Sequence, residues 1–130
     1  MSCFWDAILN KIKIDDFNKL NYSGKPGPRE FADLLKKHNR ITENILWNSQ
    51  LLTKQQCEEN YEHIQNYQSS QVNQGYDCSI CDPFLILICD LLNININHTY
   101  LGNKIDYTNK KNVFNNNYTI NIQSDKGHMW

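Results

Sequence analysis

The sequence predicts an α+β fold, with helices first and a small, mostly antiparallel sheet after them. Apolar residues recur at helical spacing up to residue 92, whereas from residue 94 onward they alternate with polar residues. Helices and strands are thus segregated along the chain. A length of 130 residues suits one domain, 1–130, and a hydrophobic content of 40% is enough to bury its core.

The first two helices are predicted from their starting residues. Ser2 is a residue type that caps helices, and we expect a helix from Cys3 to about Lys13. Its apolar positions have helical spacing: Phe4, Trp5, Ile8 and Ile12. A loop follows at residues 22–28, and Pro28 is suited to begin a second helix. The buried stripe expected on that helix is Phe31, Leu34, Leu35 and His38.

Two further helices have recognisable caps. Thr53 and Gln56 have the spacing of a capping box, which predicts a third helix. The residues on one of its faces are Cys57, Tyr61, Ile64 and Gln68. Asp82 and Pro83 are a cap and first-turn pair for a fourth helix, Phe84 to Leu92. That helix is apolar nearly all round, so we expect it at the centre of the fold.

Alternation predicts the strands of the second half. Residues 94–100 form a half-buried strand with His98 on its apolar face, ending at the turn Gly102-Asn103. Residues 104–107 are expected to return antiparallel to it. Residues 118–122 alternate again, and residues 124–127 form a tight turn into His128, Met129 and Trp130. The expected sheet is therefore a meander at the end of the chain.

Charge and hydropathy exclude several function classes. The chain has 13 Lys and Arg against 14 Asp and Glu, so it lacks the basic excess that a nucleic-acid partner requires. Its longest apolar run, residues 84–89, is too short to cross a bilayer, and no basic region precedes an apolar stretch at the N-terminus. Five cysteines at irregular spacing suit reduced thiols. We therefore expect a soluble, cytoplasmic protein without a membrane partner.

Cys3 and His128 are the candidate catalytic residues. A thiol in the first turn of a helix faces unpaired N–H groups and the positive end of the helix dipole, which favour the thiolate. Such a nucleophile needs a base, and a distant histidine supplies it when a sheet brings the two together. Gly127 allows His128 a close approach, and Trp130 can shield the resulting ion pair from water.

The segment Cys-Phe-Trp-Asp-Ala-Ile at residues 3–8 resembles the nucleophile helix of papain-like cysteine proteases, notably the ovarian-tumour (OTU) deubiquitinase family, of viral or cellular type. There, too, a Cys is followed by two bulky residues and a small one. The later order of Gly75-Tyr76, helix 82–92, strands 93–100 and 104–107, and the final segment 118–130 also resembles that family. The resemblance implies a papain-like fold and a Cys3–His128 dyad. It further implies a monomeric hydrolase without a cofactor, whose partner is ubiquitin or a ubiquitin-like modifier.

Two positions depart from the family pattern. The family usually has an Asp-Gly-Asn type loop before the Cys, which supplies oxyanion-hole N–H groups, whereas Met1 and Ser2 precede Cys3 here. The family also often places Asn or Asp two residues after the His, where this chain has Trp130. Either the site works as a dyad, or another group such as Asp125 orients the imidazole.

A narrow substrate channel is expected between Trp5 and Trp130, with room for a slender C-terminal tail. His98 is the competing base, although its place on an alternating strand is typical of a semi-buried sheet histidine. His38 and His63 are expected to be packing or surface residues on helices.

Cys78 and Cys81 form a C-x-x-C pair, which is half of a zinc site. Cys57 and His63 would have to complete it, but residues six apart on a helix point about 120° from each other. We therefore expect no metal. Two alternatives to a deubiquitinase stay open: a viral protease that processes a polyprotein with the same dyad, and a non-catalytic interaction module of the same fold. A zinc-binding module is a weaker alternative.

Overall fold

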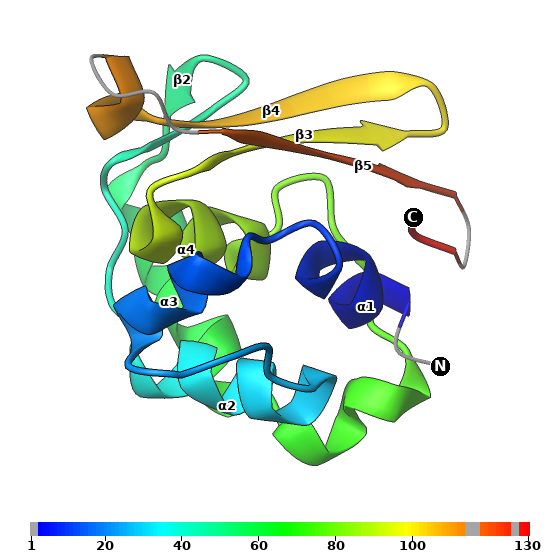
Figure 1. Ribbon diagram of the computed structural model, residues 1–130. Helices are drawn as coiled ribbons and strands as arrows, with labels where there is room; N and C mark the ends of the chain where they lie inside the picture. Colours follow the sequence, from blue (N-terminus) through cyan, green and yellow to red (C-terminus); the bar gives the residue numbers. More distant parts are fainter. Residues whose placement is uncertain (1–2, 114–117, 126–127) are drawn as a thin grey trace.

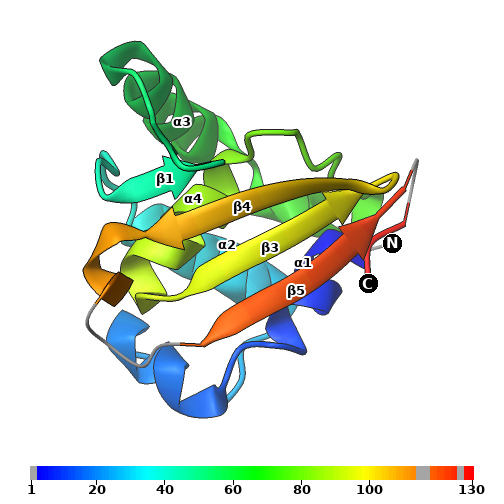
Figure 2. The ribbon, with the colours of Figure 1, turned by 90° about the horizontal axis from the view of Figure 1, so that it is seen from above.

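Helices cover one face of a mixed five-stranded sheet in the computed structural model, which describes residues 3–113, 118–125 and 128–130 (Figure 1). Ser2 and Gly127 lie outside the described residues, so their expected roles stay predictions. The α+β class is confirmed. Seen from above, the opposite face of the sheet is not covered by any helix of the described residues (Figure 2). No helix in the described part of the chain is long and apolar enough to cross a membrane.

The four expected helices are present as α1 (Cys3–Leu9), α2 (Pro28–Lys37), α3 (Lys54–Asn66) and α4 (Pro83–Leu92). Shorter 3-10 helices span Ile14–Leu20, Ser69–Gln74 and Lys110–Val113. The expected end of the first helix near Lys13 is wrong, because Lys13 has an extended backbone with φ −67° and ψ 135°. This change of direction lets Phe17 and Leu20 reach the core, where they are buried.

The helix caps predicted at Thr53 and Asp82 are confirmed. The Thr53 hydroxyl accepts a hydrogen bond from the Gln56 N–H, and the Gln56 side chain accepts one from the Thr53 N–H. The Asp82 carboxylate accepts hydrogen bonds from the N–H groups of Phe84 and Leu85 at the start of α4. Each cap satisfies N–H groups that have no partner within the helix.

The sheet has the order β2-β1-β4-β3-β5. Its strands are β1 (Ile45–Trp47), β2 (Gln50–Leu51), β3 (Asn95–Tyr100), β4 (Asn103–Asn109) and β5 (Thr119–Ser124). The expected strands and the antiparallel β3–β4 pair are confirmed. The turn between them lies at Leu101 and Gly102, both of which have positive φ, one residue earlier than the expected Gly102-Asn103. The expectation of a meander at the end of the chain is wrong in two respects. β5 pairs parallel to β3 at the edge of the sheet. β1 and β2 also belong to the sheet although they precede α3.

The core lies between the sheet and the helices. Every residue of α4 except Leu91 is buried, so its expected central place is confirmed. Apolar side chains from three strands contribute the opposite layer: Ile96, Ile105, Tyr107, Ile120 and Ile122. In both views the start of α1 and the C-terminal segment lie at the same end of the molecule (Figures 1 and 2).

Candidate active site

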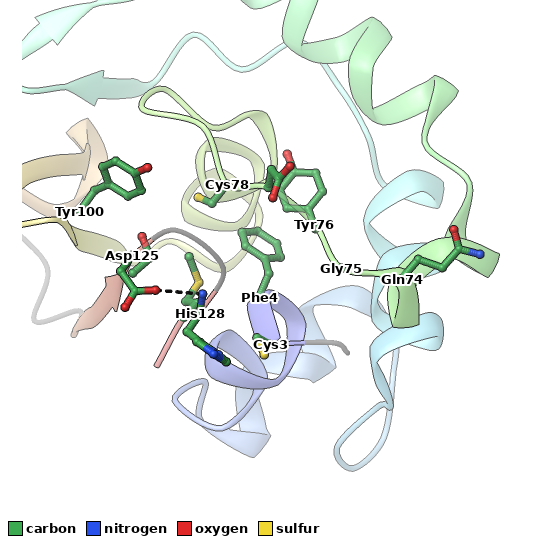
Figure 3. Close-up of a pocket in the computed structure, with 12 residues that line it drawn as sticks. Cys3, Phe4, Gln74, Gly75, Tyr76, Cys78, Tyr100, Asp125 and His128 are labelled. Atoms are coloured by element: carbon green, nitrogen blue, oxygen red, sulfur yellow. Dashed lines mark hydrogen bonds between the residues drawn. The ribbon is translucent and has the colours of Figure 1, made fainter.

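A cavity of about 630 Å³ lies where the start of α1 meets the C-terminal segment (Figure 3). Its volume is within the range of ligand-binding pockets. Three parts of the chain supply most of its wall: the first residues of α1, the segment before α4, and the end of β5 with the turn after it. The lining residues are Cys3, Phe4, Gln74, Gly75, Tyr76, Asp77, Cys78, Tyr100, Ser124, Asp125, His128 and Met129.

Two aromatic residues anchor the start of α1. Trp5 is fully buried, and Phe4 is 2% exposed with its ring centroid 4.5 Å from that of Tyr76. These contacts leave Cys3 half-buried at the wall of the cavity, as the first residue of α1. The expectation that Cys3 begins the first helix is therefore confirmed.

A short antiparallel contact holds the segment that carries His128. The main chains of Gln123 and Trp130 exchange two hydrogen bonds of 2.8 Å, and Ser124 pairs with Met129. Within this contact the Asp125 N–H donates to the His128 carbonyl at 3.0 Å. The His128 side chain is exposed, while its main chain is tied to β5.

Cys3 and His128 thus line the same cavity, although they come from opposite ends of the sequence. In Figure 3 the His128 ring is directed toward the beginning of α1, where the Cys3 side chain lies. No hydrogen bond between described residues joins the thiol to the imidazole, so proton sharing between them stays a prediction.

Asp125 also lines the cavity, but its carboxylate contacts the main chain of the histidine. Its Oδ1 accepts a hydrogen bond from the His128 backbone N–H at 3.2 Å (Figure 3). This contact shapes the turn that carries His128. The expected role of Asp125 in orienting the imidazole stays a prediction.

The substrate channel expected between Trp5 and Trp130 is wrong. Neither residue lines the cavity. Trp5 is 0% exposed and makes edge contacts with Phe4 and Phe84 at centroid distances of 4.9 and 5.0 Å, because it points into the core. Trp130 is 54% exposed. Residues 74–78 form part of the wall instead, and the sequence did not predict this part of the site.

A second thiol, that of Cys78, lines the same cavity and contacts the buried imidazole of His98. Cys78 Sγ lies 4.0 Å from His98 Nδ1, and His98 Nε2 lies 2.5 Å from the Ser124 hydroxyl. Burial, followed by the nearby Asp82 carboxylate, raises the pKa of Cys78. A protonated thiol is a weak nucleophile, so this pair is a poorer candidate than Cys3 and His128. His98 is 1% exposed, more deeply buried than expected, and burial lowers its pKa.

Asp82 holds the part of the wall that precedes α4. Its Oδ2 accepts hydrogen bonds from the Tyr76 hydroxyl at 2.8 Å and from the Ser79 N–H at 3.0 Å. Burial raises the pKa of Asp82, while these hydrogen bonds act in the opposite direction. Tyr76 packs against Phe4 and therefore links this wall to α1.

The residues considered for zinc have other contacts. The Cys57 thiol donates to the Thr42 carbonyl at 3.2 Å, and His63 Nε2 lies 3.3 Å from the Tyr76 hydroxyl. Among residues 3–113, 118–125 and 128–130, no group of three or more His, Cys, Asp or Glu is arranged to hold a metal ion.

Comparison with protein-family models, curated proteins and solved structures gives no match for this chain. A functional conclusion therefore depends on the cavity and on the chemistry of the residues that line it.

Proposed function

We propose that this chain is a cysteine-dependent hydrolase that cleaves peptide or isopeptide bonds. The observation that carries the proposal is that Cys3 and His128 line one cavity. A half-buried thiol and an exposed imidazole at one concave site are the two groups that covalent acyl transfer requires. The other thiol at the cavity, Cys78, has a pKa raised by burial, which favours Cys3 as the nucleophile.

The reaction has two halves. In the first, Cys3 Sγ attacks the carbonyl carbon, and His128 takes the thiol proton and passes it to the leaving amine as the C–N bond breaks. The product is a thioester on Cys3. In the second, His128 takes a proton from water, the hydroxide attacks the thioester, and the proton returns to the departing thiolate. A carboxylic acid leaves, and Cys3 is free again.

The proposed substrate is a protein or peptide joined to the C-terminal tail of ubiquitin or a ubiquitin-like modifier. The support is the similarity of residues 3–8 and of the later element order to the OTU deubiquitinase family. A deubiquitinase must admit a thin extended tail, and a cavity of about 630 Å³ is large enough for several residues of such a tail.

Labelling with a ubiquitin-derived thiol-reactive probe, read by mass spectrometry, tests the proposal. We expect one adduct on Cys3, lost in Cys3→Ala, slowed in His128→Ala, and retained in the matched variant Cys78→Ala. An adduct on Cys78 would show that Cys78, and not Cys3, is the nucleophile. Cleavage of peptides without probe labelling would favour a polyprotein-processing protease, and the absence of both would favour a non-catalytic module.

A further inference from the structure

The side chains of His98 and Ser124 connect β3 to the end of β5 at the edge of the cavity. His98 Nε2 lies 2.5 Å from Ser124 Oγ, and His98 is 1% exposed while Ser124 is 7% exposed. Ser124 is also a lining residue of the cavity that contains Cys3 and His128. We infer that His98 and Ser124 are positioning residues that set the location of the His128 imidazole. This inference rests on the proposed function.

The backbone pairing of β3 with β5 ends at Ser124, just before the turn that leads to His128. The last pair of that ladder joins Tyr100 to Ser124, whereas His98 pairs with Ile122. The His98 side chain therefore reaches diagonally along β5 to its final residue. Its hydrogen bond fixes the point where regular strand pairing stops and the turn begins.

From Ser124, a short series of contacts leads to His128. The Ser124 carbonyl accepts a hydrogen bond from the Leu101 N–H at 3.2 Å, and Ser124 pairs with Met129 across the turn. The next residue, Asp125, exchanges hydrogen bonds with the main chain of His128 at 3.0 and 3.2 Å. A displacement of Ser124 would therefore move the His128 imidazole relative to Cys3.

Both nitrogens of the His98 ring have a polar neighbour. Nδ1 faces Cys78 Sγ at 4.0 Å, and Nε2 faces the Ser124 hydroxyl. A neutral imidazole carries one donor and one acceptor, so it can serve both neighbours, and a serine hydroxyl can take either role. Replacing one partner leaves the other buried without its hydrogen bond. The free energy lost by burying such an unpaired polar group is larger than the net stabilisation that the hydrogen bond itself provides.

A second side-chain hydrogen bond joins β3 to β5 away from the cavity, and it provides the control for the experiment below. On the other face of the sheet the Asn97 side chain donates to the Asn121 side chain at 3.3 Å. This bond also joins β3 to β5, but Asn97 does not line the cavity. If side-chain bonding between these strands acted only on stability, Asn97→Ala and Ser124→Ala would have similar effects on the site.

The experiment compares the wild-type chain with Ser124→Ala, Ser124→Thr, His98→Gln and Asn97→Ala, each shown to be folded by circular dichroism. The first readout is the pH profile of Cys3 alkylation by iodoacetamide, followed by mass spectrometry. The second is kcat and KM for a fluorogenic ubiquitin-derived substrate. We expect Ser124→Ala and His98→Gln to shift the alkylation profile and to lower kcat about tenfold or more with little change in KM.

Ser124→Thr keeps a hydroxyl and is expected to restore most of kcat, while Asn97→Ala is expected to match the wild type. Equal alkylation profiles and equal kcat for Ser124→Ala and Asn97→Ala would overturn the inference. If the wild type does not turn over substrate, the proposed function fails. The alkylation profiles still decide the inference in that case, since they need no substrate.

Discussion

The Tyr107 hydroxyl accepts a hydrogen bond of 2.9 Å from the Asp82 N–H and donates one of 3.0 Å to the Ile80 carbonyl. Tyr107 belongs to β4, whereas Ile80 and Asp82 belong to the segment that leads into α4. One fully buried side chain thus fastens the segment that follows Cys78 to the middle of the sheet. The shape of the candidate site depends on this tie as well as on the residues that line it.

Tyr107→Phe is expected to destabilise the fold by roughly 1 to 3 kcal/mol, because it leaves the Asp82 N–H and the Ile80 carbonyl without that partner. The measurement is urea unfolding monitored by circular dichroism. Tyr61→Phe on α3, where the ring is half-buried, is the matched control and should change the unfolding free energy by less than about 0.5 kcal/mol. Equal changes in unfolding free energy for the two variants would show that the hydrogen bonds of the Tyr107 hydroxyl do not stabilise the fold.

Trp5 and Trp130 should differ in their effect on stability. Trp5→Ala removes a fully buried ring and is expected to cost about 3 to 5 kcal/mol, enough to unfold a marginally stable domain. Trp130→Ala removes a ring that is 54% exposed and should change stability by less than about 0.5 kcal/mol. Thermal unfolding measures both, and a large loss in Trp130→Ala would contradict the exposure seen here.

Stability should fall in mildly acidic solution because of His98. Burial lowers the pKa of His98 from its ordinary value of 6.5. Below pH 6.5 the unfolded chain therefore takes up a proton that the folded chain does not, so acidification favours unfolding, and stability increases again as the pH rises to 6.5. The slope is at most about 1.4 kcal/mol per pH unit for one group.

His98→Gln is expected to remove this contribution. The measurement is the unfolding free energy in urea at about pH 7.5 and about pH 5.5, compared between wild type and variant. Asn97→Gln, on the same strand, adds no titratable group and should keep the wild-type dependence. An unchanged dependence in His98→Gln would show that His98 does not titrate differently on folding.

Cysteine reactivity should separate Cys3 from the other thiols. Burial raises the pKa of the four other thiols, those of Cys57, Cys78, Cys81 and Cys89. The pKa of Cys81 is raised to about 11. Brief treatment with iodoacetamide near neutral pH is therefore expected to modify Cys3 first, since a thiolate is the reactive form. Peptide mass spectrometry gives the order of labelling, and Cys3→Ser should lose the fast phase. Earlier labelling of Cys78 or Cys81 would contradict this assignment.

The helices could be predicted because their limits depend on a few neighbouring residues. The Thr53 and Asp82 caps and the first-turn Pro28 are local signals, and the structure contains each of them. The β1–β2 hairpin was missed because its strands have three and two residues, too few to show alternation. Its turn has positive φ at Asn48 and Ser49, without the glycine that usually marks such a turn.

Long-range features of the site were harder to predict. The parallel pairing of β5 depends on the path of the chain between β4 and β5, which no local pattern specifies. Helical spacing assigns Trp5 to an apolar face, but it does not distinguish the core from a cavity beside the core. The contact of His98 with Cys78 and Ser124 joins three segments and is visible only in the folded chain.

The edge position of β5 makes the two halves of the candidate site separable. Cys3 belongs to α1, which is anchored by buried aromatic rings, whereas Ser124, Asp125 and His128 depend on the pairing of β5 with β3. Local opening of the β3–β5 pairing would move the His128 imidazole away from the cavity and leave the Cys3 thiol in place. Backbone amides of β5 should then exchange with deuterium sooner than those of α4. A ligand that contacts both sides of the cavity should slow the exchange in β5, because it stabilises the pairing of β5 with β3.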